Sequence, residues 1–432
     1  MRRLTLVLAC CVSLPGTVRA QQRAVTLAEA LGLAQRNAPA VVQAQGNARA
    51  AGAGVRSAWG EFLPRLSATS SYGRSFSEGP ARIDPITQQV ISGNTSIGSL
   101  GMGGSASLEL FTGFRRGADL ANARATVTEA DATLAFQRSQ SALTTTNQFL
   151  LALQGTDLVR VRQDAIRRAQ EKVAIANAKL ATRAATIADS LQAVVDLTNA
   201  RLRLLTEERN LVDAEAKLAR LIGVEGRVTA QADSSLFQVV SLPDSATLLS
   251  EAADRAPSFV QAEARVRSAR ASLAVIRSTY FPSISLSGST SFNGSGSNNY
   301  ELFNTRSMNV QLSWSLFNGF ARERDMAQRR ATLDANQATA ADERRRIGAE
   351  LTSWLAALRT AEERVSLTAQ SLEAARASAR VQTERYRLGS IFIEQFNQAQ
   401  EALSSAEIEA VNARYDYLRA RAQIEAILGR KL

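Results

Sequence analysis

Hydrophobic and polar positions alternate in four short segments of the chain. The clearest is 283–292, SISLSGSTSF, in which serine takes every second place, and 307–317, SMNVQLSWSLF, alternates in the same way. Two segments in the first half of the chain repeat this pattern. A period of two over about ten residues predicts β-strands with one apolar and one polar face. The four strands pair as two hairpins, at about 62–112 and about 280–318.

The two faces of these strands favour a membrane over the alternative, an ordinary soluble sandwich. The polar face is small, uncharged and rich in serine, which suits a water-filled lumen. Strands of about 9–11 residues match a tilted crossing of an outer membrane. Aromatic side chains, which lie well between lipid and water, flank the same end of both hairpins: Phe62, Phe111, Phe114, Tyr280, Phe281, Phe317 and Phe320. The residues predicted to face lipid are Leu108, Leu110, Leu286, Val310, Leu312, Trp314 and Leu316.

A long helical segment follows each hairpin. Residues 115–180 and 321–386 contain no proline and are rich in good helix formers. At about 1.5 Å per residue, each helix is about 100 Å long. Shorter helices then return, at 187–222 and 392–428, so the breaks lie at the tip far from the membrane. Apolar residues recur every seven positions, which is typical of coiled coils: Val159, Ile166, Val173 and Leu180 in the first helix, and Leu351, Leu358, Val365, Leu372, Ala379 and Tyr386 in the second.

These segments form two copies of one plan. The stretch SLELFTGFRRG, which starts at Ser107, returns as SWSLFNGFARE at Ser313, with six of eleven positions identical. Each copy contains a glycine, Gly113 or Gly319, that permits a sharp turn from strand to helix. A helix precedes each hairpin. The first repeat spans 21–223 and the second 248–432, with a linker at 224–247.

The first twenty residues have the layout of a secretory signal peptide. Two arginines precede an apolar run, and Val18-Arg19-Ala20 provides a cleavage site after Ala20. The apolar run is too short to span a bilayer. A lipoprotein, with Cys10 or Cys11 as the acylated residue, is an open alternative, although few apolar residues precede either cysteine.

The amino-acid composition argues against catalysis and metal binding. The chain has no histidine, and its two cysteines lie in the signal peptide, so the mature protein lacks the commonest general base and any thiolate. It has no paired-carboxylate or phosphate-loop motif either. We therefore expect no enzyme, no cofactor and no metal site. The mature net charge is +8, the +11 of the whole chain less Arg2, Arg3 and Arg19. Acids interleave with the basic residues, which indicates solvated helix faces and no nucleic-acid partner.

The chain resembles the TolC-like outer-membrane efflux and secretion ducts over about 25–428. The twofold repeat, the strand entries FLP at Phe62 and YFP at Tyr280, the LFTGF and LFNGF turns, and YRLGS at Tyr386 carry the likeness. The resemblance implies a mainly α fold with a β-barrel part. Each protomer of a homotrimer would give four strands to one twelve-stranded transmembrane β-barrel, and its coiled-coil helices to a tunnel through the periplasm.

The resemblance also implies a function. The protein would be the passive exit duct of a tripartite efflux or type I secretion system in the outer membrane of a Gram-negative bacterium. Its partners would be a periplasmic adaptor (membrane fusion) protein and an inner-membrane pump of the RND, ABC or MFS type. A stand-alone outer-membrane solute channel is the alternative. The cargo stays open among drugs, proteins and metals, although the lack of histidine argues against soft-metal export.

In the family, the periplasmic tip closes as an iris and carries a groove for the adaptor. Tyr386 matches the tyrosine that links neighbouring helices, and Asp189 matches the acidic position of the first tip. Gln395 and Gln398 stand where two aspartates often ring the pore. Helix capping is the alternative role for Asp189 and Glu394. The predicted gate residues are Asp189, Tyr386, Glu394, Gln395 and Gln398, and the predicted adaptor groove contains Arg183, Gly389 and Ser390.

Overall fold

The computed structural model describes residues 23–83, 85, 86, 88, 90, 91, 95–237, 244–296 and 300–432. The predicted signal peptide and both cysteines lie outside the described residues. The chain divides into two compact units, each built from segments of both sequence repeats. Unit 1 comprises 1–42, 137–252 and 348–432, and unit 2 comprises 43–136 and 253–347.

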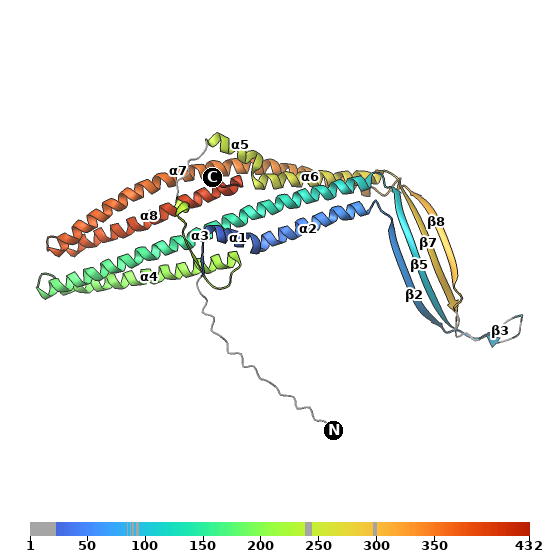
Figure 1. Cartoon of the computed structure of the whole chain (residues 1–432), viewed down its shortest axis with the longest axis horizontal. Coiled ribbons are helices and arrows are strands. Elements are labelled where there is room, and N and C mark those ends of the chain that lie inside the picture. The colour runs from blue at the N-terminus through green and yellow to red at the C-terminus, as the bar shows by residue number, and fades with distance from the viewer. Residues whose placement is uncertain are drawn as a thin grey trace, which may run out of the picture. The chain divides into compact units, whose positions relative to one another are not determined.

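The same series of elements occurs twice along the chain (Figure 1). The first series is α1 (Leu27–Asn37), α2 (Pro39–Gly60), β2 (Arg65–Ser77), β5 (Thr95–Phe111), α3 (Arg115–Ala181) and α4 (Ile187–Ile222). The second is α5 (Ser245–Arg255), α6 (Pro257–Arg277), β7 (Ser283–Gly296), β8 (Phe303–Ser313), α7 (Ala321–Arg387) and α8 (Ile393–Leu428). Short elements complete the chain: β1 (Arg23–Val25), β3 (Arg82–Ile83), β4 (Val90–Ile91), β6 (Val228–Ala230), and 3₁₀ turns at Ser234–Phe237 and Ser278–Tyr280.

The long helices of the two series have equal lengths, as do the helices that return from them. Helices α3 and α7 contain 67 residues each, and α4 and α8 contain 36 each. The predicted combination of long helices with four strands is confirmed. Among the described residues, no helix is long and apolar enough to cross a membrane.

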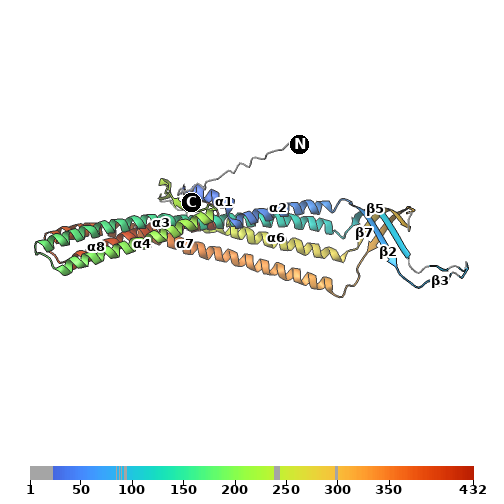
Figure 2. The ribbon, with the colours of Figure 1, turned by 90° about the horizontal axis from the view of Figure 1, so that it is seen from below.

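Unit 2 contains a four-stranded antiparallel sheet in the order β2-β5-β7-β8. The four strands lie side by side in Figure 1, and Figure 2 shows β2, β5 and β7 of the same sheet from below. The register keeps each kind of residue on one face: Ser67, Ser105, Ser289 and Ser307 form a continuous row across the sheet. On the other face Leu108, Leu286 and Val310 form a row. Strands β2 and β8 are the two edges, and neither has an outer neighbour among the described residues.

Two residues predicted for the apolar strand face lie beyond the end of β8, and a third lies at an irregularity within β5. Strand β8 ends at Ser313, so Trp314 and Leu316 belong to the turn that follows it. The partner strand β7 begins at Ser283, which pairs with Ser313, so the ladder ends there. Beyond it, the guanidinium of Arg322 donates to the carbonyl oxygens of Ser315 and Leu316 at 2.8 and 3.0 Å. Leu110 lies at a register shift of β5 between Glu109 and Phe111.

Both strand-to-helix turns are built alike. Gly113 and Phe114 both have positive φ, 60° and 68°, and Gly319 and Phe320 repeat this with 66° and 64°. The rings that flank each glycine pack edge to face, with centroids 5.5 Å and 5.4 Å apart.

One arginine after each turn fixes its geometry. Arg116 donates to the Leu110 carbonyl and lies over the Phe62 ring, as Arg322 lies over the ring of Tyr280. The sequence repeat is therefore a repeat of one hydrogen-bonded turn.

In unit 1, α3 lies beside α4, and α7 beside α8. Gln148 of α3 donates to the Ala214 carbonyl of α4, and Arg364 of α7 binds Glu409 of α8 at 2.7 Å. The seven-residue stripe predicted in α7 is mostly buried, but the one in α3 is only half-buried. Near the end of α3, Lys172 and Ala176 are buried, whereas the predicted Val173 is only half-buried.

The two turn glycines differ in their surroundings, which gives a test of the turn. A Cβ at Gly113 would lie 2.6 Å from the Phe281 Cβ and 2.8 Å from the Ser278 carbonyl oxygen, whereas a Cβ at Gly319 would meet nothing within 4 Å. A left-handed alanine costs about 1–2 kcal/mol at either site. We therefore expect Gly113→Ala to lower the unfolding temperature clearly more than Gly319→Ala, measured by circular dichroism in detergent. Equal losses would show that the backbone alone sets the effect.

Candidate functional site at the hairpin ends of unit 1

The two helical hairpins of unit 1 end in the same hydrogen-bonded turn. The Arg183 amide donates to the Leu180 carbonyl at 3.0 Å, and the next amide reaches back to Lys179 at 2.8 Å. In the second hairpin Gly389 and Ser390 make the matching bonds, to Tyr386 at 3.1 Å and Arg385 at 2.9 Å. Arg183 and Gly389 both have positive φ, 61° and 78°. The predicted groove residues Arg183 and Gly389 therefore occupy equivalent exposed positions in the two repeats.

Asp189 works as a helix cap in this structure. Its carboxylate accepts from the Thr186 amide at 2.9 Å, while the Thr186 hydroxyl accepts from the Asp189 amide at 3.2 Å. This reciprocal pair is a capping box, which satisfies two otherwise free donors at the start of α4. The matching position in α8 is Gln395, and there the cap residue Phe392 offers no side-chain bond. The first hairpin end is thus fixed more firmly than the second.

Tyr386 is held by its ring rather than by its hydroxyl. The side chain is 3% exposed, and its ring stacks on Phe396 with centroids 5.0 Å apart. The ammonium of Lys179, on α3, lies 4.0 Å from the centroid of the Tyr386 ring, which adds a cation–π contact between the two hairpins. The hydroxyl is buried and has no hydrogen-bond partner. Burial raises the pKa of Tyr386, and the nearby charge of Asp189 raises it further.

The remaining predicted gate residues are exposed. Glu394 lines a pocket between the hairpins, while Gln395 and Gln398 lie on the solvent-accessible surface of α8. The Asp189 carboxylate lies close enough to Tyr386 to help raise the pKa of its hydroxyl. It does not join the two glutamines to either of them through a hydrogen bond between described side chains.

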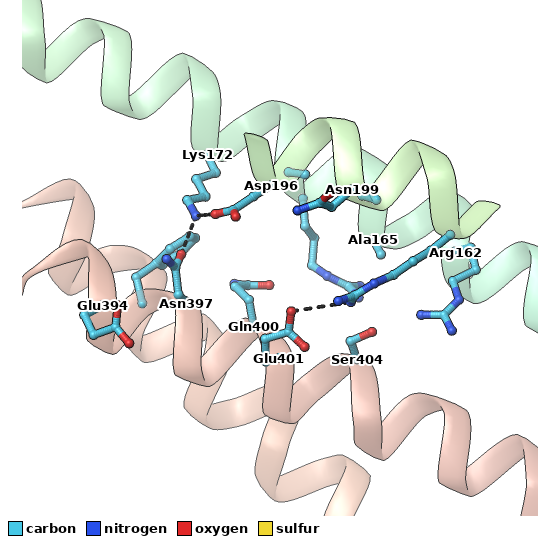
Figure 3. Close-up of a pocket in the computed structure, with 15 residues that line it drawn as sticks. Arg162, Ala165, Lys172, Asp196, Asn199, Glu394, Asn397, Gln400, Glu401 and Ser404 are labelled. Carbon is cyan, nitrogen blue, oxygen red and sulfur yellow. Dashed lines mark hydrogen bonds and ion pairs between the residues drawn. The ribbon is translucent and has the colours of Figure 1, made fainter. Parts of the chain in front are cut away.

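A buried lysine lies in the pocket that Glu394 borders (Figure 3). Lys172 of α3 has a 5% exposed side chain, and its ammonium donates to the carboxylate of Asp196 on α4 and to the amide oxygen of Asn397 on α8. It also lies 5.9 Å from the centroid of the Phe396 ring. The pocket has a volume of about 260 Å³. One ammonium therefore connects three helices and both hairpins.

Other ion pairs extend this connection along the seam between the hairpins. Arg168 of α3 binds Glu407 of α8 at 2.7 Å, and both side chains are mostly buried. Glu171 of α3 pairs with Arg387 of α7 at 2.7 Å. Arg203 of α4 reaches Glu401 of α8 at 3.4 Å. The polar contacts that cross the seam therefore involve all four helices.

Sequence reasoning missed Lys172 and its partners, although a signal was present. The chain has only four lysines among 51 basic residues, and two of them, Lys172 and Lys179, are spaced by seven on one helix. That spacing places both on one face. Each lies against a ring of the second hairpin, Phe396 or Tyr386. The partners Asp196 and Asn397 could not be found from sequence because they lie far from Lys172 along the chain.

The ion pairs and ring contacts of this site hold the helices of unit 1 together. The described residues contain no cluster of carboxylates suited to a metal ion. Several buried polar atoms near the seam lack a hydrogen-bond partner: Arg162 Nε, Gln382 Oε1, the Tyr386 hydroxyl and Gln400 Oε1. Buried polar groups are normally paired, and each unpaired one costs about 1–3 kcal/mol. The seam is therefore closed, but several of its buried polar atoms have no hydrogen-bond partner.

Solved structures share this fold. A crystal structure of CusC matches with a TM-score of 0.78 and 17% identity, covering 94% of this chain and 92% of that one. The outer membrane protein VceC of Vibrio cholerae matches with 0.74 and 16%, covering 94% and 96%. The CmeC outer membrane channel of Campylobacter jejuni matches with 0.76 and 16%, covering 93% and 85%. No curated protein sequence matches the chain.

The family described as outer membrane efflux protein matches residues 30–224 and 248–430. These two segments include both helical hairpins and both β-hairpins described above. The family and the fold are those of channel proteins, not of enzymes. The chain belongs to the outer membrane efflux protein family and is an efflux duct of the outer membrane.

Proposed function

We propose that three copies of this chain form the passive exit duct of a tripartite efflux or secretion system. The observation that carries the proposal is the four-stranded sheet with two open edges, β2 and β8. In lipid, each unpaired backbone group costs several kcal/mol, so an open sheet is not a viable membrane structure. Closure needs the β2 edge of one copy to pair with the β8 edge of the next. Three such sheets give a barrel of twelve strands.

The faces of the sheet support this assembly. The serine row of β2, β5, β7 and β8 includes two short hydroxyl contacts, Ser67 to Ser105 at 2.7 Å and Ser289 to Ser307 at 2.8 Å. A wall of small hydroxyls suits a lumen that conducts solutes and retains none. The opposite face presents Leu286, Val310 and similar residues to lipid. The exposed rings of Phe114 and Phe320 then lie at the membrane boundary.

The hairpin ends of unit 1 form the periplasmic gate in this proposal. Lys172, Asp196 and Asn397 hold the two hairpins together, and Lys179 holds the Tyr386 ring. Because several buried polar atoms of the seam are unpaired, water that enters on opening stabilises them. That gain offsets part of the free energy needed to separate the ion pairs, so the seam can open without a large net cost. Asp189, Glu394, Gln395 and Gln398 remain candidate pore-lining residues.

The same hairpin ends offer a surface to a periplasmic adaptor. Arg183, Gly389 and Ser390 are exposed and occupy matching turns. An adaptor that binds both turns would contact the two hairpins at once and could shift one against the other. The driving force would come from an inner-membrane pump of the RND, ABC or MFS type, since the duct has no energy source of its own.

The assembly is tested by its oligomeric state. Proline at the centre of an edge strand removes a ladder hydrogen bond and clashes with an added neighbour. We expect the purified mature protein to be a trimer in detergent, and Met308→Pro on β8 to yield monomers with their helices retained. Multi-angle light scattering measures the mass, and circular dichroism the helices. A wild-type protein that is monomeric and soluble without detergent would refute the duct.

The seam is tested by removing its lysine. We expect Lys172→Met to destabilise the hairpin pair by about 1–3 kcal/mol, because a charged hydrogen-bond donor is lost from a mostly buried site. The conductance of the resting channel in planar bilayers should rise several-fold. The matched control is Lys217→Met, which removes an exposed lysine paired with Asp213 on α4. Equal conductance in the two variants would exclude Lys172 from the gate.

Tyr386 tests whether ring or hydroxyl closes the seam. Tyr386→Phe keeps the stack on Phe396 and the contact with Lys179 and removes only an unpaired hydroxyl. We expect its resting conductance to equal that of the wild type. Tyr386→Ala loses the ring, at a cost of about 3–5 kcal/mol, and should raise conductance. A Tyr386→Phe channel that leaks would show that the hydroxyl, and not the ring, closes the seam.

A further inference from the structure

The apolar face of the four-stranded sheet carries a groove with a volume of about 740 Å³. Its floor is made by small residues, Gly104, Ala106 and Gly288, and larger apolar side chains border it, among them Leu66 and Met308. A Cβ at Gly288 would meet only the Ser307 carbonyl oxygen, at 3.9 Å, so a side chain fits at this position of the floor without a clash. The groove covers three rows on one face of the sheet, those of Leu286, Gly288 and Thr290. From the first row to the last is four residues along the strand, or about 13 Å at ~3.3 Å per residue. Its shape and lining fit an acyl chain.

One charged side chain borders this groove. Among the described residues that line it, Arg306 alone carries a charge. Arg306 belongs to β8, where it pairs with Thr290 of β7 in the row above Gly288 and Met308. Its side chain is exposed, and no carboxylate in the described part of the chain pairs with it. An arginine on a lipid-facing strand destabilises a barrel in proportion to its depth. An anion bound to its guanidinium would offset this cost.

The depth of Arg306 indicates where that anion lies. Arg306 is three residues from the loop end of β8 at Phe303 and seven from the helix end at Ser313. At ~3.3 Å per residue and a tilt of about 45°, these separations are about 7 Å and about 16 Å along the membrane normal. The guanidinium can reach the nearer boundary by extending along the strand. That boundary is the outer leaflet if the helices project into the periplasm.

We propose that this groove binds lipid A, the phosphorylated glycolipid of the outer leaflet. The proposal rests on the proposed membrane function. One acyl chain lies along Gly104, Ala106 and Gly288, and a phosphate of the headgroup accepts two hydrogen bonds from the Arg306 guanidinium. A planar guanidinium matches a phosphate in this two-bond geometry. Each protomer holds one lipid, so the trimer holds three.

The experiment measures lipid A binding to the purified trimer by native mass spectrometry. We expect the wild type to retain up to three molecules of lipid A. Arg306→Gln should raise the lipid concentration at half-saturation about tenfold, and Arg306→Lys by less, because the charge remains. Gly288→Val fills the floor but keeps the arginine, and should weaken binding to a similar extent. The control is Arg329→Gln, which removes an exposed arginine from α7 and should change nothing.

Two further probes identify the lipid. Dephosphorylated lipid A should bind the wild type as weakly as lipid A binds Arg306→Gln. Phosphatidylglycerol should bind about tenfold more weakly than lipid A. Equal binding by either probe, or an Arg306→Gln trimer that binds like the wild type, would overturn the assignment. Failure of the duct itself looks different, since that protein would be a monomer without detergent, whereas loss of the lipid site leaves the trimer intact.

Discussion

The unpaired backbone at the two edges of the sheet constrains everything else in this molecule. Strands β2 and β8 each present a row of N–H and C=O groups with no partner among the described residues. Hydrocarbon offers such groups no substitute partner, so the sheet needs further strands at both edges. In the proposed trimer, identical copies supply these strands, and the threefold symmetry applies to their helices as well. The chain therefore needs a fixed exit from strand to helix, and the paired turns at Gly113 and Gly319 supply it.

The two repeats share their backbone geometry and differ in how firmly it is held. Both strand-to-helix turns use a glycine and a phenylalanine at positive φ, followed by an arginine on the preceding carbonyls. At the hairpin ends, the first copy has a capping box at Thr186, whereas the second begins α8 at Phe392 without a side-chain cap. Duplication thus preserved the turns, and divergence left one hairpin end freer than the other. Asymmetry of this kind suits a gate in which one hairpin moves against a fixed neighbour.

Local pattern was enough to predict the elements but not the contacts between them. Alternating serines predicted strands such as 283–292, and the absence of proline predicted the two long helices, because both signals act within a few residues. The strand prediction extended too far, to Trp314 and Leu316, because the partner strand β7 begins at Ser283, which pairs with Ser313. The seven-residue pattern predicted that Val173 lies in the contact between helices, but Val173 is only half-buried and the neighbouring Lys172 is buried. Its burial depends on Asn397, which lies on a helix more than 200 residues later.

Polar groups have different roles in the sheet and in the seam. In the sheet, every interior strand must keep its hydrogen bonds, since nothing in lipid replaces them. In the seam, Lys172 exchanges water for Asp196 and Asn397, while the Tyr386 hydroxyl remains unpaired. Because water can return to each of these groups, breaking the seam exposes donors and acceptors that are at once resolvated. A polar seam can therefore open and close repeatedly, whereas an apolar one of the same area would stay shut.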